Sequence, residues 1–279
     1  MGGKAILVLG AMLLDEKSVK TEYGNVFYWC SDSWMKGRQV LFFLHGMTAD
    51  HTMFQPQYQF FQNKYNIITW DAPAHGKSRP FTKYNYETIA YIIKSILETE
   101  HIDNAVFIGQ SMGGFIAQAV MKRFPKLASA FIAIDSCPYG IQYYSKSDIW
   151  WLRQIGWMAY LYPVKAMKKA IAKQNTATGA GYENMISMLR HYGKAELCHL
   201  MEIGYASILD DNCDLEIACP TILIVGGQDK TGKVKIYNKQ WSEATGFPLI
   251  IIDGAAHNSN VDQPHQVNMV IERFLKELP

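Results

Sequence analysis

An apolar run that ends in a serine between glycines constrains this chain more than any other stretch. Residues 105–115 read Ala-Val-Phe-Ile-Gly-Gln-Ser-Met-Gly-Gly-Phe, and helical spacing begins at Phe115. The pattern predicts a strand that turns sharply into a helix, with Ser111 on the corner. In a G-x-S-x-G turn the serine takes a strained conformation, and its small neighbours let strand and helix pass closely. A Gly-Ser loop without chemistry is the simpler alternative, because short patterns recur by chance.

Length and composition limit the fold classes and partners that the chain can have. It has 279 residues, 49% of them hydrophobic and 19% charged, which is ordinary for one large α/β domain or two small ones. A formal net charge of +2 gives no electrostatic argument for nucleic acid or an anionic membrane as partner. The five cysteines are odd in number and lack metal-ligand spacing. We therefore expect free thiols, a cytoplasmic location and no metal.

The amino-terminal stretch faintly resembles a signal peptide. Lys4 is followed by an apolar run over 6–14, but Gly10 interrupts it and charged residues 15–17 follow instead of a cleavage site. We expect an extra first strand, or a leader that packs on the body. No other stretch approaches the ~18 apolar residues that a membrane span requires.

Strand-like and helix-like stretches alternate along most of the chain. Strands are predicted at 26–29, 40–44, 66–70, 105–109, 130–134, 220–225 and 248–252, and helices at 53–61, 86–98, 115–124, 233–245 and 263–278. This rhythm predicts an α/β fold with a mostly parallel central sheet and helices on both faces. The loops that begin at His45, Asp71, Ser111 and Asp135 then leave from the carboxyl edge, where ligands bind.

The alternation of strand-like and helix-like stretches stops between residues 137 and 215. This span is rich in aromatic residues and methionine, and its pattern is helical at 149–162, 164–173, 182–192 and 196–209. We interpret 137–215 as a helical cap inserted between two parts of the core, 1–136 and 216–279. Most of its large side chains would bury the underside of the cap. A few should line a pocket, and we name Trp150 and Trp151 as substrate-binding.

Ser111 needs a base and an orienting acid before its hydroxyl becomes a useful nucleophile. His257 follows a late strand within a loop of small residues, and Asp229 ends the preceding strand. The predicted catalytic order is therefore Ser111, Asp229, His257. Asp229 could instead cap the helix that follows it, and Asp135 also ends a strand, so the acid has an alternative.

An oxyanion hole needs two backbone donors aimed at the developing charge. We assign one to Met112, directly after the nucleophile, and the other to Met47, in the loop after the 40–44 strand. His45 and Gly46 belong to the same loop and are further candidates for substrate binding. For His45, turn geometry is favoured over substrate contact, because its loop works by backbone donation.

These features together resemble the capped enzymes of the α/β-hydrolase fold, over nearly the whole chain. One departure is Ala74, where relatives commonly have glycine, and it affects a loop with a mainly structural role. The resemblance implies a cofactor-independent hydrolase that acts through an acyl-enzyme. The residues that carry it are His45-Gly46, the loop 71–78, Gly109 to Gly114, Asp229, and the stretch from Ala256 to Pro264.

The expected function is therefore a serine hydrolase for a small-molecule substrate. We expect it to cleave a small to medium, partly apolar ester, amide or carbonyl-adjacent C–C bond through an acyl-enzyme on Ser111. Lactone opening, peptidase action and cofactor-free perhydrolysis are rival reactions, and a ligand-binding receptor or scaffold with little turnover is a rival class. A homodimer is possible. The substrate depends on the cap, whose side-chain directions the sequence does not give.

Overall fold

The computed structural model describes residues 14–32 and 34–278, and it contains one eight-stranded sheet. The strand order is β1-β2-β4-β3-β5-β6-β7-β8. The strands are β1 (Leu14–Thr21), β2 (Gly24–Ser31), β3 (Val40–Leu44), β4 (Asn66–Trp70), β5 (Ala105–Gln110), β6 (Ala128–Ile134), β7 (Thr221–Gly226) and β8 (Leu249–Ile252). From β4 to β8 all neighbours are parallel, so the predicted mostly parallel α/β sheet is confirmed.

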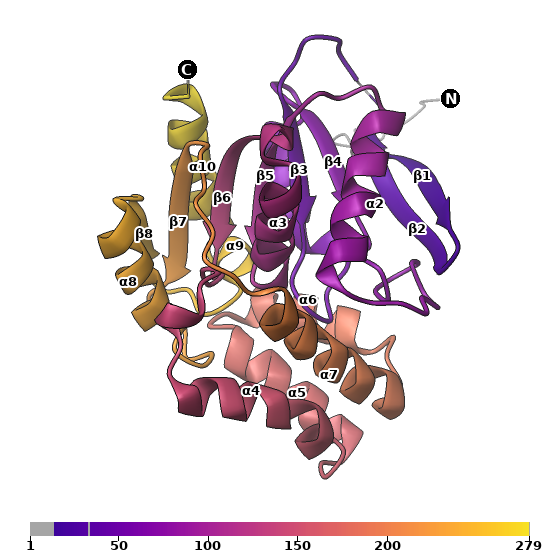
Figure 1. Cartoon of the computed structure of the whole chain (residues 1–279), viewed down its shortest axis with the longest axis vertical. Helices are drawn as coiled ribbons and strands as arrows, with labels where there is room; N and C mark the ends of the chain where they lie inside the picture. The colour runs from indigo at the N-terminus through magenta and orange to yellow at the C-terminus, as the bar shows by residue number, and fades with distance from the viewer. Residues whose placement is uncertain (1–13, 33, 279) are drawn as a thin grey trace, which may run out of the picture.

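Helices cover both faces of the sheet (Figure 1). One face packs against α2 (Tyr86–Thr99), α3 (Met112–Arg123) and α8 (Val234–Thr245). The other packs against α1 (Gln55–Phe61) and α10 (Pro264–Lys276). Strands β3, β4, β5 and β7 are buried along their whole length and β6 everywhere but at Ser129, which explains why they read as largely continuous apolar runs. Short helical turns also occur at η1 (His51–Phe54), η2 (Pro125–Leu127), η3 (Ile141–Tyr143) and α9 (Ser259–Asp262).

An antiparallel hairpin of β1 and β2 forms one edge of the sheet. The sequence predicted the core of β2 but not β1, and the predicted strand or leader over 6–14 lies outside the described residues except for Leu14. Strand β1 pairs on one side only, and charged residues such as Glu16 and Lys20 are exposed along it. An edge strand of this kind lacks the apolar run that marks a buried strand.

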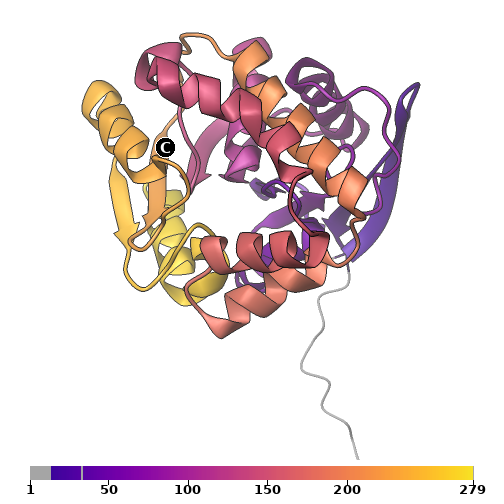
Figure 2. The same cartoon turned by 90° about the horizontal axis from the view of Figure 1, so that it is seen from below.

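Four helices follow β6 at the carboxyl end of the sheet, and we call them the cap helices. They are α4 (Lys146–Ala159), α5 (Val164–Asn175), α6 (Gly179–Leu189) and α7 (Lys194–Asp211). Helix α4 packs on α7 and α5 packs on α6, so the cap consists of two pairs (Figure 2). The four predicted helices are present with ends shifted by a few residues, and we keep 137–215 as a proposed boundary for the cap. No helix in the described residues is both long and apolar enough to cross a bilayer.

Candidate active site

Ser111 stands on the turn between β5 and α3, as the motif predicts. Its backbone has φ 50° and ψ −115°, a strained conformation for a residue with a side chain. The Ser111 N–H donates to the Ile134 carbonyl at 2.9 Å, which ties the turn to β6. A Cβ on Gly113 would lie 1.9 Å from the Leu44 carbonyl oxygen. Only glycine therefore lets α3 pass so close to β3.

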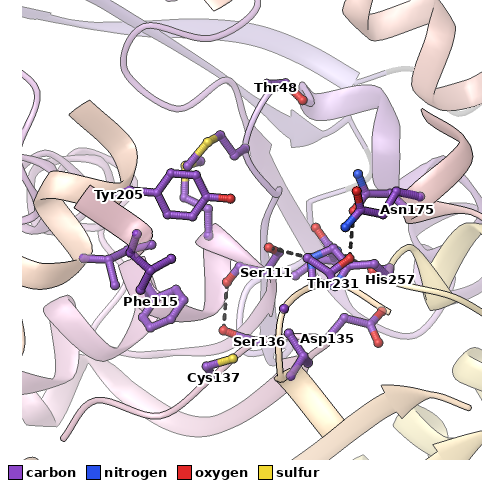
Figure 3. Close-up of a pocket in the computed structure, with 18 of the residues that line it drawn as sticks. Thr48, Ser111, Phe115, Asp135, Ser136, Cys137, Asn175, Tyr205, Thr231 and His257 are labelled. Carbon is purple, nitrogen blue, oxygen red and sulfur yellow. Dashed lines mark hydrogen bonds between the residues drawn. The ribbon is translucent and has the colours of Figure 1, made fainter. Parts of the chain in front are cut away.

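A chain of hydrogen bonds runs from Ser111 through His257 to Asp229. His257 Nε2 lies 2.9 Å from Ser111 Oγ, and Figure 3 shows the two side chains facing each other. His257 Nδ1 lies 2.8 Å from Asp229 Oδ2, and the Thr231 N–H donates to the other oxygen at 2.7 Å. The Asp229 carboxylate accepts only, so it favours the tautomer in which Nδ1 carries the proton. Nε2 is then free to accept the Ser111 proton.

Asp135 supports this site without occupying the acid position. Its two oxygens accept the N–H groups of Gly226 and Ser259, at 2.7 and 2.9 Å, so it ties β7 to the loop that carries His257. Burial raises the pKa of Asp135 to about 7 against the opposing effect of His257, and the charge of Asp229 adds to the rise. Burial alone would lower the pKa of His257. The Asp229 charge and hydrogen bond, together with the Asp135 charge, outweigh it and raise that pKa above 6.5.

The two residues predicted to form the oxyanion hole both line the cavity beside Ser111. Met112 is the first residue of α3, where backbone N–H groups lack helical partners and the helix dipole favours negative charge. Met47 lies in the loop after β3, and its side chain reaches Gly204 of the cap. Among the described residues neither N–H has a hydrogen-bond acceptor. We keep both N–H groups as the proposed oxyanion donors.

A cavity of about 600 Å³ lies between the carboxyl edge of the sheet and the cap helices. Both helix pairs of the cap contribute apolar side chains to its wall. In Figure 3, Phe115 and Tyr205 lie on one side of Ser111 and Asn175 on the other. The charged Asp148 and Lys233 also line it, but they pair with each other at 2.8 Å. The cavity therefore suits a neutral, largely apolar ligand. Its apolar cap residues include Trp151, Leu152, Ile155, Ile171, Met185, Met201 and Ile208.

The predicted substrate-binding residues separate into two groups. Trp151 lines the cavity, whereas its neighbour Trp150 is not among the lining residues and is 55% exposed. His45 and Gly46 are not among the residues that line the cavity, and their role in substrate binding stays a prediction. His45 is buried and accepts the Ala72 N–H at Nε2, at 3.0 Å, while Nδ1 donates to the Gly46 carbonyl at 2.8 Å. Burial lowers the pKa of His45, so the ring stays neutral and fixes the turn.

Gln110 is a residue of the site that the sequence reasoning missed. Its side-chain amide donates to the His257 carbonyl at 2.7 Å, and its carbonyl end packs so closely on Gly46 that a Cβ there would lie 2.1 Å away. Gln110 thus joins the nucleophile turn to the His257 loop and the Met47 loop. The sequence did carry a signal for it, a polar residue at the end of an otherwise apolar strand, and the structure shows that this residue is buried.

A second group of polar side chains has the spacing of a metal site. Within the described residues, Asp50, His51 and Asp71 bring one ligand atom each to within 4.8 Å of one another. These atoms already have partners. His51 Nδ1 lies 2.8 Å from Asp71, and Asp50 accepts the Thr52 N–H at 2.9 Å. The contacts account for the cluster as loop structure, and the absence of a metal stays a prediction.

Known proteins resemble this chain in sequence and in fold. A family model described as alpha/beta hydrolase fold matches residues 39–164. The chain is 26% identical over 255 residues to a Haemophilus influenzae protein provisionally named an esterase/lipase, covering 85% of this chain and 83% of that protein. It is 26% identical over 261 residues to 3-oxoadipate enol-lactonase 2 of Acinetobacter baylyi, covering 86% and 89%.

Solved structures repeat the same architecture. A thermophilic esterase from Thermogutta terrifontis, in a malate-bound structure, aligns with a TM-score of 0.75 over 95% of this chain and 99% of that one. Sequence identity in that pair is 17%, so the likeness bears on the fold alone.

Proposed function

We propose a serine hydrolase function for this chain, which belongs to the α/β-hydrolase fold superfamily. The observation that carries the proposal is the contact chain Ser111–His257–Asp229 at the base of a largely apolar cavity. Such a chain activates a hydroxyl for attack on an acyl carbon. The substrate class is a small to medium, partly apolar ester, amide or carbonyl compound.

The reaction would proceed in two halves. His257 Nε2 takes the Ser111 proton as Oγ attacks the carbonyl carbon, and the Met47 and Met112 N–H groups stabilise the oxyanion. His257 then gives the proton to the leaving group, and the acyl-enzyme remains on Ser111. Water enters, loses a proton to His257 and attacks the acyl carbon. His257 then returns that proton to Ser111 Oγ as the bond between Oγ and the acyl carbon breaks, which releases the acid and restores the serine. Asp229 holds the imidazolium in place during both halves.

Ester and lactone hydrolysis are the two forms of this reaction that the relatives support. One similar protein carries an esterase/lipase name and another is an enol-lactonase. Both reactions use the same nucleophile and oxyanion hole. They differ in the leaving group, which stays attached to the acyl chain when a lactone opens. Comparing p-nitrophenyl esters with lactones and vinylogous diketones would separate esterase, lactonase and C–C hydrolase activity.

Covalent labelling is the direct test. A fluorophosphonate probe should modify the unmutated protein at Ser111 and should not modify Ser111→Ala. Ser136→Ala is the matched control because Ser136 also lines the cavity, and its hydroxyl donates to the Ser111 carbonyl at 2.8 Å. Labelling should survive in that variant. A folded, unmutated protein that resists the probe would contradict the proposal.

A ligand-binding receptor or scaffold on the same fold is the rival class. It would bind a cavity-sized ligand and turn it over slowly or not at all. Single-turnover kinetics separate the two, because a receptor that keeps the contact chain would acylate once and release product very slowly. A cofactor-free perhydrolase would instead form peracid from hydrogen peroxide and a carboxylic acid.

A further inference from the structure

The outer surface of the cap exposes large apolar side chains around the end of α4. Trp157, Tyr160, Leu161 and Tyr162 are each 44% to 70% exposed, and Trp150 is exposed on the same helix. We call these five residues the aromatic patch. Trp150 and Trp157 are seven positions apart on α4, which places them on one helix face, and residues 160–162 follow directly after the helix ends. Neighbouring large apolar residues exposed together mark an interaction site more often than single ones do.

The patch is flanked by positive charge. Residues 146–175 contain six Lys and Arg side chains and one acidic residue, although the whole chain carries a formal net charge of only +2. The acid, Asp148, is engaged by Lys233 and by the Tyr237 hydroxyl. Lys165, Lys169 and Lys173 of α5 are exposed. The local surface is therefore far more basic than the chain as a whole.

Acidic side chains belong to the other two cap helices. Glu183 lies on α6, and Glu196 and Glu202 lie on α7. Glu196 pairs with Arg79 at 3.4 Å, and Glu202 lies 3.9 Å from His199. Glu202 packs against Gly156 of α4, so one exposed acid borders the patch, and the excess of positive charge comes from α5.

The patch lies on and directly after a helix that also contributes to the cavity wall. Helices α4 and α5 occupy the end of the molecule farthest from the sheet (Figure 1), and Figure 2 views this end directly. Both helices contribute residues to the cavity wall, and Trp151 is at once half-exposed and part of that wall. A partner that covers the patch would therefore contact a helix that helps to form the cavity.

We propose that the aromatic patch and the lysines of α5 dock onto the surface of an anionic phospholipid membrane. Trp and Tyr rings favour the headgroup region, because one end of each is apolar and the other can hydrogen-bond. Lysines beside them attract acidic headgroups. A helix with this composition lies in the membrane surface without crossing it.

A second copy of the chain is the competing occupant, and charge argues against it. A twofold dimer through this face would oppose the patch to itself, and each copy would bring its own lysine-rich α5. Like charges brought together in this way weaken the contact. An anionic lipid surface instead satisfies the apolar and the basic parts together.

Vesicle co-sedimentation tests the proposal on the full chain. The protein should sediment with vesicles of phosphatidylcholine mixed with phosphatidylglycerol, and much less with phosphatidylcholine alone. The triple variant Trp157→Ser, Leu161→Ser, Tyr162→Ser should lose about tenfold or more of its partition into the mixed vesicles. It should keep its hydrolysis of a short, water-soluble ester, because none of these residues lines the cavity.

A matched control separates the patch from apolar exposure in general. Tyr91, Ile236 and Met269 are exposed to a similar degree and lie on α2, α8 and α10. Changing all three to serine should leave vesicle binding unchanged.

A second variant tests the basic component. Lys165→Glu with Lys169→Glu should weaken binding to mixed vesicles and reduce its salt dependence, with thermal unfolding unchanged. Lack of vesicle binding by the unmutated protein would overturn the proposal. So would equal binding by the triple variant, or a dimer in sedimentation equilibrium that the triple variant dissociates.

Discussion

The side-chain amide of Gln110 donates a hydrogen bond to the main-chain carbonyl of His257 at 2.7 Å. The residue before the nucleophile thereby holds the loop that carries the base. This contact crosses the carboxyl edge of the sheet and is fully buried. It explains how two residues 147 positions apart keep Ser111 Oγ and His257 Nε2 within hydrogen-bond distance.

Loss of the Gln110 contact should impair catalysis through geometry. Gln110→Met keeps the volume but removes the donor, so we expect kcat to fall by about tenfold or more while KM changes little. Gln118→Met is the matched control. Gln118 is also buried and also bonds backbone groups, at Cys137 and Tyr139. It should lose stability and retain kcat, and equal kcat losses in both variants would refute the positioning role.

Asp229 and Asp135 should differ sharply when each carboxylate is replaced. Asp229→Asn leaves the imidazole without its acceptor, and we expect kcat to fall by about 10³- to 10⁴-fold. Asp135→Asn should retain most activity, because Asp135 bonds the backbone at Gly226 and Ser259 instead of the imidazole. Steady-state kinetics on one ester compare the two. A greater loss in Asp135→Asn would reverse the assignment of the acid.

The pH dependence of kcat/KM should have an acid limb above pH 6.5. His257 acts as a base only when its imidazole is neutral. Its environment raises its pKa above 6.5, so the inactive imidazolium persists to a higher pH and kcat/KM falls off below that pKa. Asp135→Asn removes one of the charges that raise this pKa. The acid limb of that variant should therefore move to lower pH. A shift to higher pH, or none, would show that the Asp135 carboxylate does not act on the imidazole.

The two neighbouring tryptophans of α4 should behave differently. Trp151→Ala enlarges the cavity, and KM for an ester with an aromatic group should rise severalfold. Trp150→Ala should leave KM unchanged, because Trp150 does not line the cavity. The two rings touch, with centroids 4.8 Å apart, so both variants lose one ring contact. A difference in KM between the two variants would therefore come from the contact of Trp151 with substrate.

Gly113 should be intolerant of any side chain. Gly113→Ala would press a methyl group against the Leu44 carbonyl, and we expect a loss of about 3 kcal/mol or more in the free energy of unfolding. Gly179→Ala is the control, because a Cβ there meets nothing within 4 Å. It should change stability by less than about 1 kcal/mol. Urea denaturation measures both, and equal values would contradict the close approach of α3 and β3.

The central sheet and the order of the site residues were predictable because each depends on local pattern. Buried parallel strands are continuous apolar runs, and the polar residue that ends each one falls at the same edge. This is why Ser111, Asp229 and His257 could be expected together from their positions alone. Edge strand β1 has no such run, and it was missed.

Side-chain direction was not predictable in the cap. Trp150 and Trp151 are adjacent, and which of them faces the cavity depends on how α4 packs on α7. His45 was assigned to the cavity by its position in the loop after β3, but its hydrogen bonds turn it inward. A count of charge over the whole chain also hid the basic character of α4 and α5.

Folding and chemistry make opposite demands at one position of this molecule. The φ of 50° at Ser111 is unfavourable for any residue with a side chain, and glycine would relieve it. A chain with glycine at position 111 would have a more stable fold, but it would lack the hydroxyl that forms the acyl bond. The corner that exposes the hydroxyl thus makes the working protein less stable than its inert version, and a screen for stability alone would select against its activity.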